Sequence, residues 1–139
     1  MKKTLIDAGA LLAFINHDDH HHEWAQEVFK SLRPPVYITE PAVTEAVYLV
    51  KDRSGHELAM ELLRLLKAHF KLVCPLEENW DFIIPKMEKY SQMDLADATL
   101  VRATELLQDC ELVTVDRKDF STFRRFNRDV IPIIAPPKK

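Results

Sequence analysis

Two aspartates directly follow short apolar segments of the chain. Asp7 comes after Leu5 and Ile6, and Asp116 comes after residues 113–115, which read Val-Thr-Val. Short continuous apolar segments are typical of strands buried on both faces of a parallel sheet. Because ligands in such sheets bind beyond the carboxyl ends of the strands, we expect Asp7 and Asp116 to lie together at one sheet edge.

Glu45 lies in a segment that is otherwise apolar. Residues 42–50 read AVTEAVYLV, a pattern that predicts a helix buried on nearly all sides. No lysine or arginine stands three or four residues from Glu45, within reach on the same helix. Because burying an unpaired carboxylate costs roughly several kcal/mol, something cationic should face it. That cation is either an arginine from elsewhere in the fold or a metal ion.

A helix predicted from Ser91 to Gln108 carries two further acids. Asp94 and Asp97 are three residues apart and share one flank of this helix, and Asp97 borders its apolar face. Asp94 also fits a structural explanation, since Ser91 and Asp94 have the spacing of a capping box.

The remaining aspartates have structural alternatives as well. Asp7 could cap the helix that follows it, and Asp116 and Asp119 could be turn residues. A cluster of carboxylates without bases nevertheless predicts a site for a hard cation, Mg²⁺ or Mn²⁺. The four acids expected to form that site are Asp7, Glu45, Asp97 and Asp116.

Short strands alternate with helices along the chain. We expect strands at 4–6, 36–38, 72–74, 112–115 and, as an edge strand, 131–134. We expect helices at 8–15, 19–32, from a Thr39 cap (with Pro41 in the first turn) to about 50, from a Ser54 cap onward, 77–90 with a kink at Pro85, and 91–108. This alternation predicts an α/β fold whose parallel sheet is covered on both faces.

Composition narrows the possible functions. The 139 residues are 47% apolar and suit one domain spanning 1–139, and the two glycines exclude a glycine-rich phosphate loop. From Arg117 to Lys139 there are seven lysines or arginines and two aspartates, a net charge of +5, so the rest of the chain carries −8. An acidic body with a basic segment indicates a cation site beside a surface for anions.

The cysteines and histidines suggest no further site. Cys74 and Cys110 lack metal-ligand spacing and read as buried thiols in a reducing compartment. The longest apolar run, 8–15, is too short to span a bilayer, so we expect a cytoplasmic protein without a membrane partner. His17 and His20–His22 have transition-metal affinity, but consecutive helical residues diverge, so the sequence favours a solvated helix start.

Five segments together resemble the PIN domain family, most closely its small bacterial and archaeal VapC-type toxins. The segments are LIDAGALLAF, DDHHHEWA, TEPAVTEAV, MDLADATLVRA and LVTVDRKDF, which span nearly the whole chain in order. The resemblance implies a three-layer α/β/α fold with a short, mainly parallel sheet flanked by helices. It also implies a Mg²⁺- or Mn²⁺-dependent ribonuclease, the toxin of a type II toxin–antitoxin pair, with an antitoxin partner and a homodimeric state.

The resemblance also assigns residues. The four acidic positions of the family fall on Asp7, Glu45, Asp97 and Asp116. Asp94 and Asp119 match acidic positions found in part of the family, and Thr114 lies where the family often has a hydroxyl residue. For RNA, we expect backbone contacts from the basic residues Arg117, Lys118, Arg124, Arg125 and Arg128.

Two other functions compete with a ribonuclease. One is a PIN-fold module that binds RNA or protein without significant turnover, which only a measurement of cleavage separates. The other is a phospho-acceptor receiver domain, which needs an acidic pair after its first strand and an acceptor aspartate at the end of a central strand. Asp7 stands alone after Ile6, and Asp52 follows a predicted helix, so the receiver domain is disfavoured.

Overall fold

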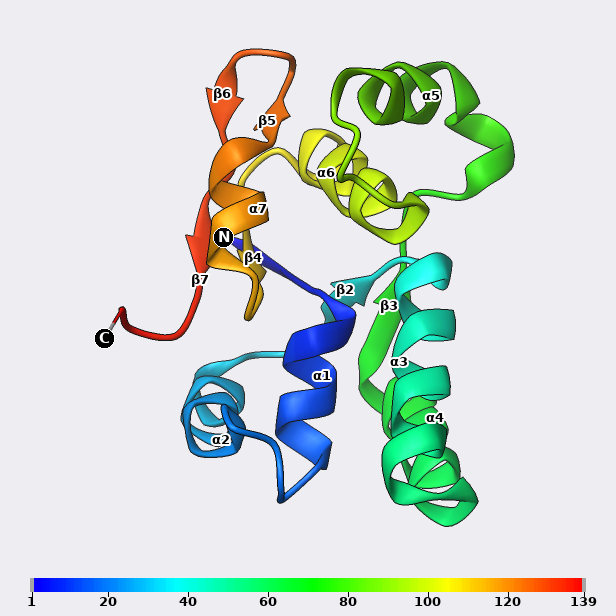
Figure 1. Cartoon of the computed structure of the whole chain (residues 1–139), viewed down its shortest axis with the longest axis vertical. Helices are drawn as coiled ribbons and strands as arrows, with labels where there is room; N and C mark the ends of the chain where they lie inside the picture. The colour runs from blue at the N-terminus through cyan, green and yellow to red at the C-terminus, as the bar shows by residue number, and fades with distance from the viewer. Residues whose placement is uncertain (1, 139) are drawn as a thin grey trace.

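A five-stranded sheet forms the centre of the protein. The computed structural model describes residues 2–138 (Figure 1), so Lys139 of the basic segment lies outside it. The strands are β1 (Lys3–Ile6), β2 (Val36–Ile38), β3 (Phe70–Leu72), β4 (Cys110–Val113) and β7 (Ile133–Ile134). They are ordered β3-β2-β1-β4-β7, and every adjacent pair runs parallel. The predicted parallel sheet is therefore confirmed.

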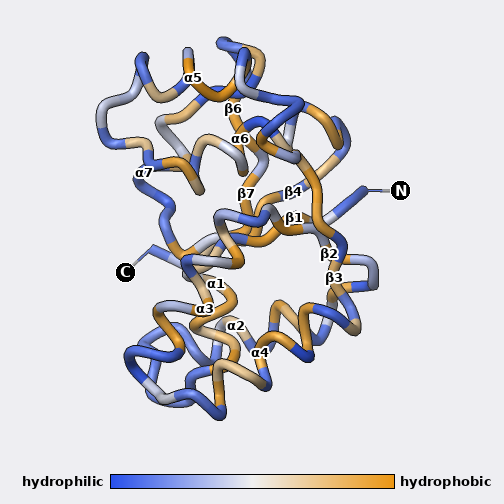
Figure 2. The backbone as a smooth tube through the Cα atoms, turned by 90° about the vertical axis from the view of Figure 1, so that its right-hand side faces the viewer, coloured by the Kyte–Doolittle hydropathy of each residue, from blue (hydrophilic) through white to orange (hydrophobic). Residues whose placement is uncertain are grey.

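Helices cover the sheet from two sides. They are α1 (Ala8–Ile15), α2 (His22–Ser31), α3 (Glu40–Ser54), α4 (His56–His69), α5 (Trp80–Lys89), α6 (Leu95–Leu107) and α7 (Arg117–Thr122), with a 3₁₀ turn at Leu76–Glu78. Figure 2 shows α1–α4 on one side of the strands and α5–α7 on the other. This arrangement confirms the three-layer α/β/α architecture. A two-stranded antiparallel ribbon, β5 (Arg124–Arg125) with β6 (Asp129–Val130), lies beyond α7.

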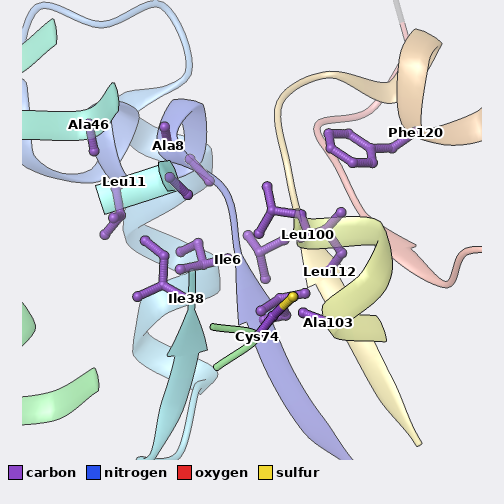
Figure 3. Close-up of a cluster of buried hydrophobic side chains, with 14 of the residues drawn as sticks. Ile6, Ala8, Leu11, Ile38, Ala46, Cys74, Leu100, Ala103, Leu112 and Phe120 are labelled. Atoms are coloured by element: carbon purple, nitrogen blue, oxygen red, sulfur yellow. The ribbon is translucent and has the colours of Figure 1, made fainter. Parts of the chain in front are cut away.

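The core fills both spaces between sheet and helices. Leu5, Ile6, Leu112 and Val113 on the two central strands have no exposed surface. Figure 3 shows Ile6 grouped with side chains of α1 and α3, and Leu112 grouped with those of α6. Strands buried on both faces explain why the sequence has continuous apolar runs there instead of alternation.

Several element boundaries differ from the prediction because caps and turns decide them. The helix expected at 19–32 begins at His22, since Asp19 forms a turn whose carboxylate accepts from the His21 amide (2.9 Å). Ser54 does not cap a helix but ends α3, which is longer than expected. Gly55, at a φ of 95°, instead joins α3 to α4, a backbone conformation that favours glycine.

Other differences lie in the second half of the chain. The predicted strand 72–74 is found at Phe70–Leu72, with Cys74 beyond it in the left-handed region (φ 64°). The helix expected from Ser91 begins at Leu95. The residues expected at 77–90 divide into the 3₁₀ turn and α5, which contains Pro85. The pattern predicted neither α7 nor the β5–β6 ribbon.

Within residues 2–138, no helix combines the length and apolar character required to cross a bilayer.

Candidate active site

All four predicted acids line one small cavity. It measures about 190 Å³ and lies at the carboxyl ends of β1 and β4, where Asp7 and Asp116 follow the strands. Glu45 from α3 and Asp97 from α6 complete its acidic lining. The sheet topology accounts for this meeting, because β1 and β4 are adjacent and parallel.

Asp7 is the most buried of these acids, with 6% of its surface exposed. It caps α1, and its Oδ1 accepts a hydrogen bond from the Ala10 amide (2.8 Å). Its Oδ2 accepts a hydrogen bond from the Thr114 hydroxyl. The Thr114 oxygen in turn accepts from the Asp116 amide (2.9 Å), so one hydroxyl connects both strand-end aspartates.

Asp97 and Asp116 each take part in a helix cap. The Asp94 carboxylate accepts from the Asp97 amide (2.7 Å), and Asp97 Oδ2 accepts from the Asp94 amide (3.2 Å). Asp116 caps α7 by accepting from the Asp119 amide (3.0 Å). The capping box is therefore Asp94–Asp97, not the predicted Ser91–Asp94. The cap and cation-site explanations are compatible for Asp97 and Asp116, because each uses only one carboxylate oxygen in its cap.

The prediction that Glu45 lies in a fully buried helix is wrong. Only Ala42, Ala46 and Val50 of α3 are buried, while Glu45 and Tyr48 are exposed. The opposite face of α3 borders an open groove, and so its apolar residues do not all face the core. Glu45 still lines the acidic cavity, at its solvent side.

Burial and mutual repulsion disfavour the charged forms of these acids. Burial raises the pKa of Asp7 from 3.8 to about 7, with smaller contributions from the charges of Glu45 and Asp116. Burial also raises the pKa of Asp97 to about 7, and the nearby carboxylates of Asp94 and Glu45 add to this rise. Partial desolvation and the charge of Asp94 raise the pKa of Glu45. The cavity thus holds negative charge that no cationic side chain of its described lining balances.

The lining of the cavity contains no lysine, arginine or histidine among the described residues. This excludes the alternative that an arginine within residues 2–138 lines the cavity and balances Glu45. No three histidine, cysteine or acidic side chains of that range lie close enough together to hold a metal ion. The donor set nevertheless fits a hard divalent cation, which prefers several carboxylate oxygens and compensates the charge that raises these pKa values.

The supporting residues lie around the cavity. Asp94 lies beside Asp97 in the capping box, and Thr114 is fully buried behind Asp7 and Asp116. The pKa of Asp119 is raised by desolvation and by the neighbouring Asp116 charge. Gly9 also lines the cavity, and a methyl group on it would lie 2.7 Å from Val115 Cγ2. No pattern in the sequence singles out Gly9, because the close approach of α1 to the segment after β4 is visible only in the fold.

The predicted RNA-binding arginines have contacts of their own. Arg125 donates to the carbonyls of Thr104 (3.0 Å) and Gln108 (2.7 Å) at the end of α6. Arg117 donates to the carbonyl of Pro136 (3.1 Å) and Arg124 to that of Ser121 (2.7 Å). Lys118 and Arg128 are exposed, and Arg128 lies 3.4 Å from the Asp129 carboxylate. RNA contact by these residues stays a prediction.

A buried polar network went unrecognised in the sequence. Glu105 is 5% exposed and accepts from Lys86 Nζ (2.8 Å), Arg102 (3.1 Å) and the Phe126 amide (2.6 Å). Burial alone would raise the pKa of Glu105, but these donors hold it below its usual value. The network fixes α5 and the β5–β6 ribbon to α6, and only the i,i+3 spacing of Arg102 and Glu105 could have signalled part of it.

A family model for the PIN domain matches residues 4–127. No curated protein sequence matches the chain. Several solved structures share its fold. VapC20 from Mycobacterium tuberculosis, described as a sarcin-ricin-loop-cleaving toxin, has a TM-score of 0.73 at 18% identity, with 94% of this chain and 100% of that chain covered.

Two complexes give similar matches. A toxin–antitoxin complex from Klebsiella pneumoniae has a TM-score of 0.68 at 16% identity, covering 99% of this chain and 100% of that chain. DNA-bound VapBC from Salmonella typhimurium has a TM-score of 0.60 at 12% identity, covering 97% and 98%. At these identities the likeness concerns the fold.

Proposed function

The chain belongs to the PIN domain family, and from this premise we propose that it is a metal-dependent ribonuclease, the toxin of a type II toxin–antitoxin pair. The observation that carries the proposal is the cavity at the carboxyl ends of β1 and β4, lined by four carboxylates and no cationic side chain of the described residues. The similar folds of a toxin that cleaves the sarcin-ricin loop and of two toxin–antitoxin assemblies support this assignment.

We propose that Asp7, Glu45, Asp97 and Asp116 hold Mg²⁺ or Mn²⁺. When bound, such a cation supplies Lewis-acid stabilisation of phosphate charge and activates a water for attack on the phosphodiester. Cleavage by direct hydrolysis would leave a 5′-phosphate and a 3′-hydroxyl. We expect the rate of RNA cleavage to fall when any one of these four carboxylates is replaced by an uncharged group.

The chain's own residues prepare the site. Thr114 orients Asp7 through its hydroxyl and favours the ionised form of that carboxylate, because a hydrogen bond to the charged oxygen lowers the pKa. The Asp94–Asp97 box fixes the start of α6 and with it the position of Asp97. Leu100 and Phe120 form an apolar wall that limits water around the acids.

Glu45 gives the sharpest test of catalysis. It is exposed, and no side-chain hydrogen bond or ion pair holds it within the described residues, so Glu45→Gln should leave stability nearly unchanged. The uncharged amide should lower metal-dependent RNA cleavage by a factor on the order of 100 or more. Glu40→Gln is the matched control, because Glu40 is also exposed on α3 but does not line the acidic cavity.

The same experiment decides between enzyme and binding module. Cleavage in Mn²⁺ by the wild type and by Glu40→Gln, but not by Glu45→Gln, supports the ribonuclease. RNA binding without cleavage in either Mg²⁺ or Mn²⁺ would instead favour a PIN-fold module that binds RNA or protein.

We further propose that an antitoxin segment covers the acids from an adjacent groove. The groove measures about 970 Å³ and includes Glu45 and the exposed apolar residues Tyr48, Leu72 and Leu95. The charged residues of its lining are all acidic, namely Glu40, Glu45, Glu77 and Asp94. A basic amphipathic segment complements both properties, and an arginine or lysine on it would replace the charge of the metal.

Two experiments test this partner assignment. Co-expression with a small protein encoded by a short reading frame next to the gene for this chain should relieve growth arrest caused by the chain. Tyr48→Asp should weaken the complex with that protein without abolishing RNA cleavage. Absence of arrest when the chain is expressed alone, with its RNA intact, would argue against the toxin assignment. RNA contacts by the basic segment 117–128, a homodimer and a cytoplasmic location remain part of this proposal.

A further inference from the structure

A second cavity lies at the other end of the strands from the acids. It measures about 510 Å³ and is bordered by the start of β1, by the segment that leads into β2, and by β4. Lys3 begins β1 and Asp7 follows its end, so the two sites are separated by roughly the length of a four-residue strand, about 13 Å. None of the four acids lines this second cavity.

Positive charge predominates in its lining. Lys2, Lys3 and Arg33 contribute three cationic side chains, and Glu111 is the one acidic residue of the described lining. Glu111 lies 4.0 Å from Lys2, a distance at which exposed ion pairs contribute little. The excess charge therefore resides on Lys3 and Arg33.

Lys3 and Arg33 differ from the arginines of the C-terminal segment. Arg117 and Arg125 donate to backbone carbonyls, so part of their hydrogen-bonding capacity serves the fold. Lys3 and Arg33 are exposed and come from distant parts of the sequence, and in the described chain no hydrogen bond or ion pair engages their charged groups. Cations that converge on a concave surface without an internal partner are suited to an external anion.

The rest of the lining is apolar and aromatic, which suits a flat ring such as a nucleobase. Leu32, Pro34, Pro35 and Ile134 provide apolar surface, and the half-buried Tyr37 adds an aromatic ring. Aromatic side chains next to cationic ones bind nucleotides by stacking on the base while the cations contact the phosphate.

We propose that this cavity binds a phosphorylated nucleoside, with Lys3 and Arg33 on the phosphate and Tyr37 beside the base. Its source is either one nucleotide of an RNA strand, in which case the inference rests on the proposed ribonuclease function, or a free nucleoside monophosphate. Both sources share the same chemistry, and the experiment distinguishes them.

Binding is measured on the full chain in EDTA, so that the result does not depend on cleavage. Uridine and adenosine 5′-monophosphates and a short single-stranded RNA are titrated into ¹⁵N-labelled protein, with uridine as the uncharged comparison. Amide shifts at residues 2–4, 31–33 and 37 are expected with the phosphorylated probes and not with uridine. Shifts with RNA alone identify the strand as the source, and shifts with the monophosphates identify the free nucleotide as a sufficient ligand.

The double variant Lys3→Glu/Arg33→Glu tests the assigned cations. It should weaken binding of the phosphorylated probe by roughly tenfold or more and, for RNA, reduce the salt slope by about 0.7 per lost phosphate contact. Lys67→Glu/Lys71→Glu is the matched control, because it makes the same change in net charge at exposed residues outside the cavity. Tyr37→Leu, which keeps the charges, should weaken binding of the two monophosphates and of the RNA.

Three outcomes would overturn the proposal. These are shifts of equal size with uridine, shifts that map away from the cavity, and an equal loss of affinity in the double variant and its control. Loss of RNA cleavage in the Glu45→Gln variant bears only on the acidic site. Failure of the proposed function and failure of this inference are therefore separately observable.

Discussion

Thr114 and Asp7, which are 107 positions apart in the sequence, share a buried hydrogen bond in which the threonine hydroxyl donates to Asp7 Oδ2. The bond exists because β1 and β4 are parallel neighbours in the sheet, with Ile6 beside Val113. Thr114 also accepts from the Asp116 amide, so this one hydroxyl sets the relative position of two acids of the cavity. Removal of this hydroxyl should therefore affect the site without altering the fold.

We predict that Thr114→Val lowers both stability and cleavage. Valine preserves the shape but removes the hydroxyl, which leaves Asp7 Oδ2 and the Asp116 amide without this partner. The free energy of unfolding should fall by about 1–3 kcal/mol, and the pKa of Asp7 should rise above its value of about 7, because the Thr114 hydrogen bond lowers it. Urea unfolding and a pH profile of cleavage measure the two effects.

Thr104→Val is the matched control. Thr104 is equally buried, but its hydroxyl donates to the Val101 carbonyl within α6, away from the cavity. A comparable loss of cleavage in both variants would show that the Thr114 effect is general destabilisation.

The positions of the two strand-end aspartates could be predicted from the sequence because they depend only on the order and direction of the strands. Asp7 and Asp116 had to lie at the same sheet edge once their two apolar strands were parallel neighbours. Helical spacing placed Asp94 and Asp97 only on one flank of a helix, and the fold brings Asp97 to the cavity. Glu45 was assigned correctly to the cavity, but its predicted burial was wrong, because an apolar helix face can border a groove as well as the core. A pattern along one helix does not reveal which neighbouring element is missing.

The positive charge of the C-terminal segment does not reveal which contacts its arginines make in the fold. The sequence predicts that Arg117, Arg124 and Arg125 belong to a surface for anions, which stays a prediction; in the fold their guanidinium groups also donate to backbone carbonyls. The contacts of Arg117 and Arg125 require the final segment and the C-terminal end of α6 to be in place, which no local pattern specifies. The ribbon and the Glu105 network were missed for the same reason, since they depend on contacts between distant segments.

We predict that the basic segment contains separable functions. Lys118→Glu/Arg128→Glu should weaken RNA binding and flatten its salt dependence with little change in stability, because both side chains are exposed. Arg125→Ala should instead lower the free energy of unfolding by about 1–3 kcal/mol, because the Thr104 and Gln108 carbonyls each lose a hydrogen bond from its guanidinium group. Fluorescence anisotropy in EDTA measures the RNA affinity, and urea unfolding measures the free energy of unfolding. Unchanged RNA affinity in Lys118→Glu/Arg128→Glu would place the RNA-binding surface elsewhere.

We predict that the metal-free protein loses stability as the pH rises from about 4 to 7. Asp7 and Asp97 have pKa values of about 7 in the folded protein and near 3.8 when unfolded, so the folded state binds their protons more tightly. Their stabilising contribution is complete below pH 3.8 and is lost as the pH rises towards 7. Urea unfolding in EDTA should show a smaller loss for Asp97→Asn, and the difference from the wild type isolates Asp97. If the free energy of unfolding falls equally with pH in the wild type and in Asp97→Asn, the raised pKa of Asp97 is contradicted.

The last prediction concerns the cation itself. Asp97→Asn retains an oxygen that can accept from the Asp94 amide, so the cap of α6 should survive while one repelling charge is removed. In EDTA at pH 8 the variant should therefore melt at a higher temperature than the wild type. Mn²⁺ at about 100 times its Kd should stabilise the wild type by about 2.7 kcal/mol through mass action, and the variant by clearly less. Asp81→Asn, an exposed acid on α5 outside the cavity, serves as the control and should respond to Mn²⁺ as the wild type does. If the wild type and Asp97→Asn gain equally, or neither gains, the four carboxylates do not form a cation site, whatever RNA the protein meets.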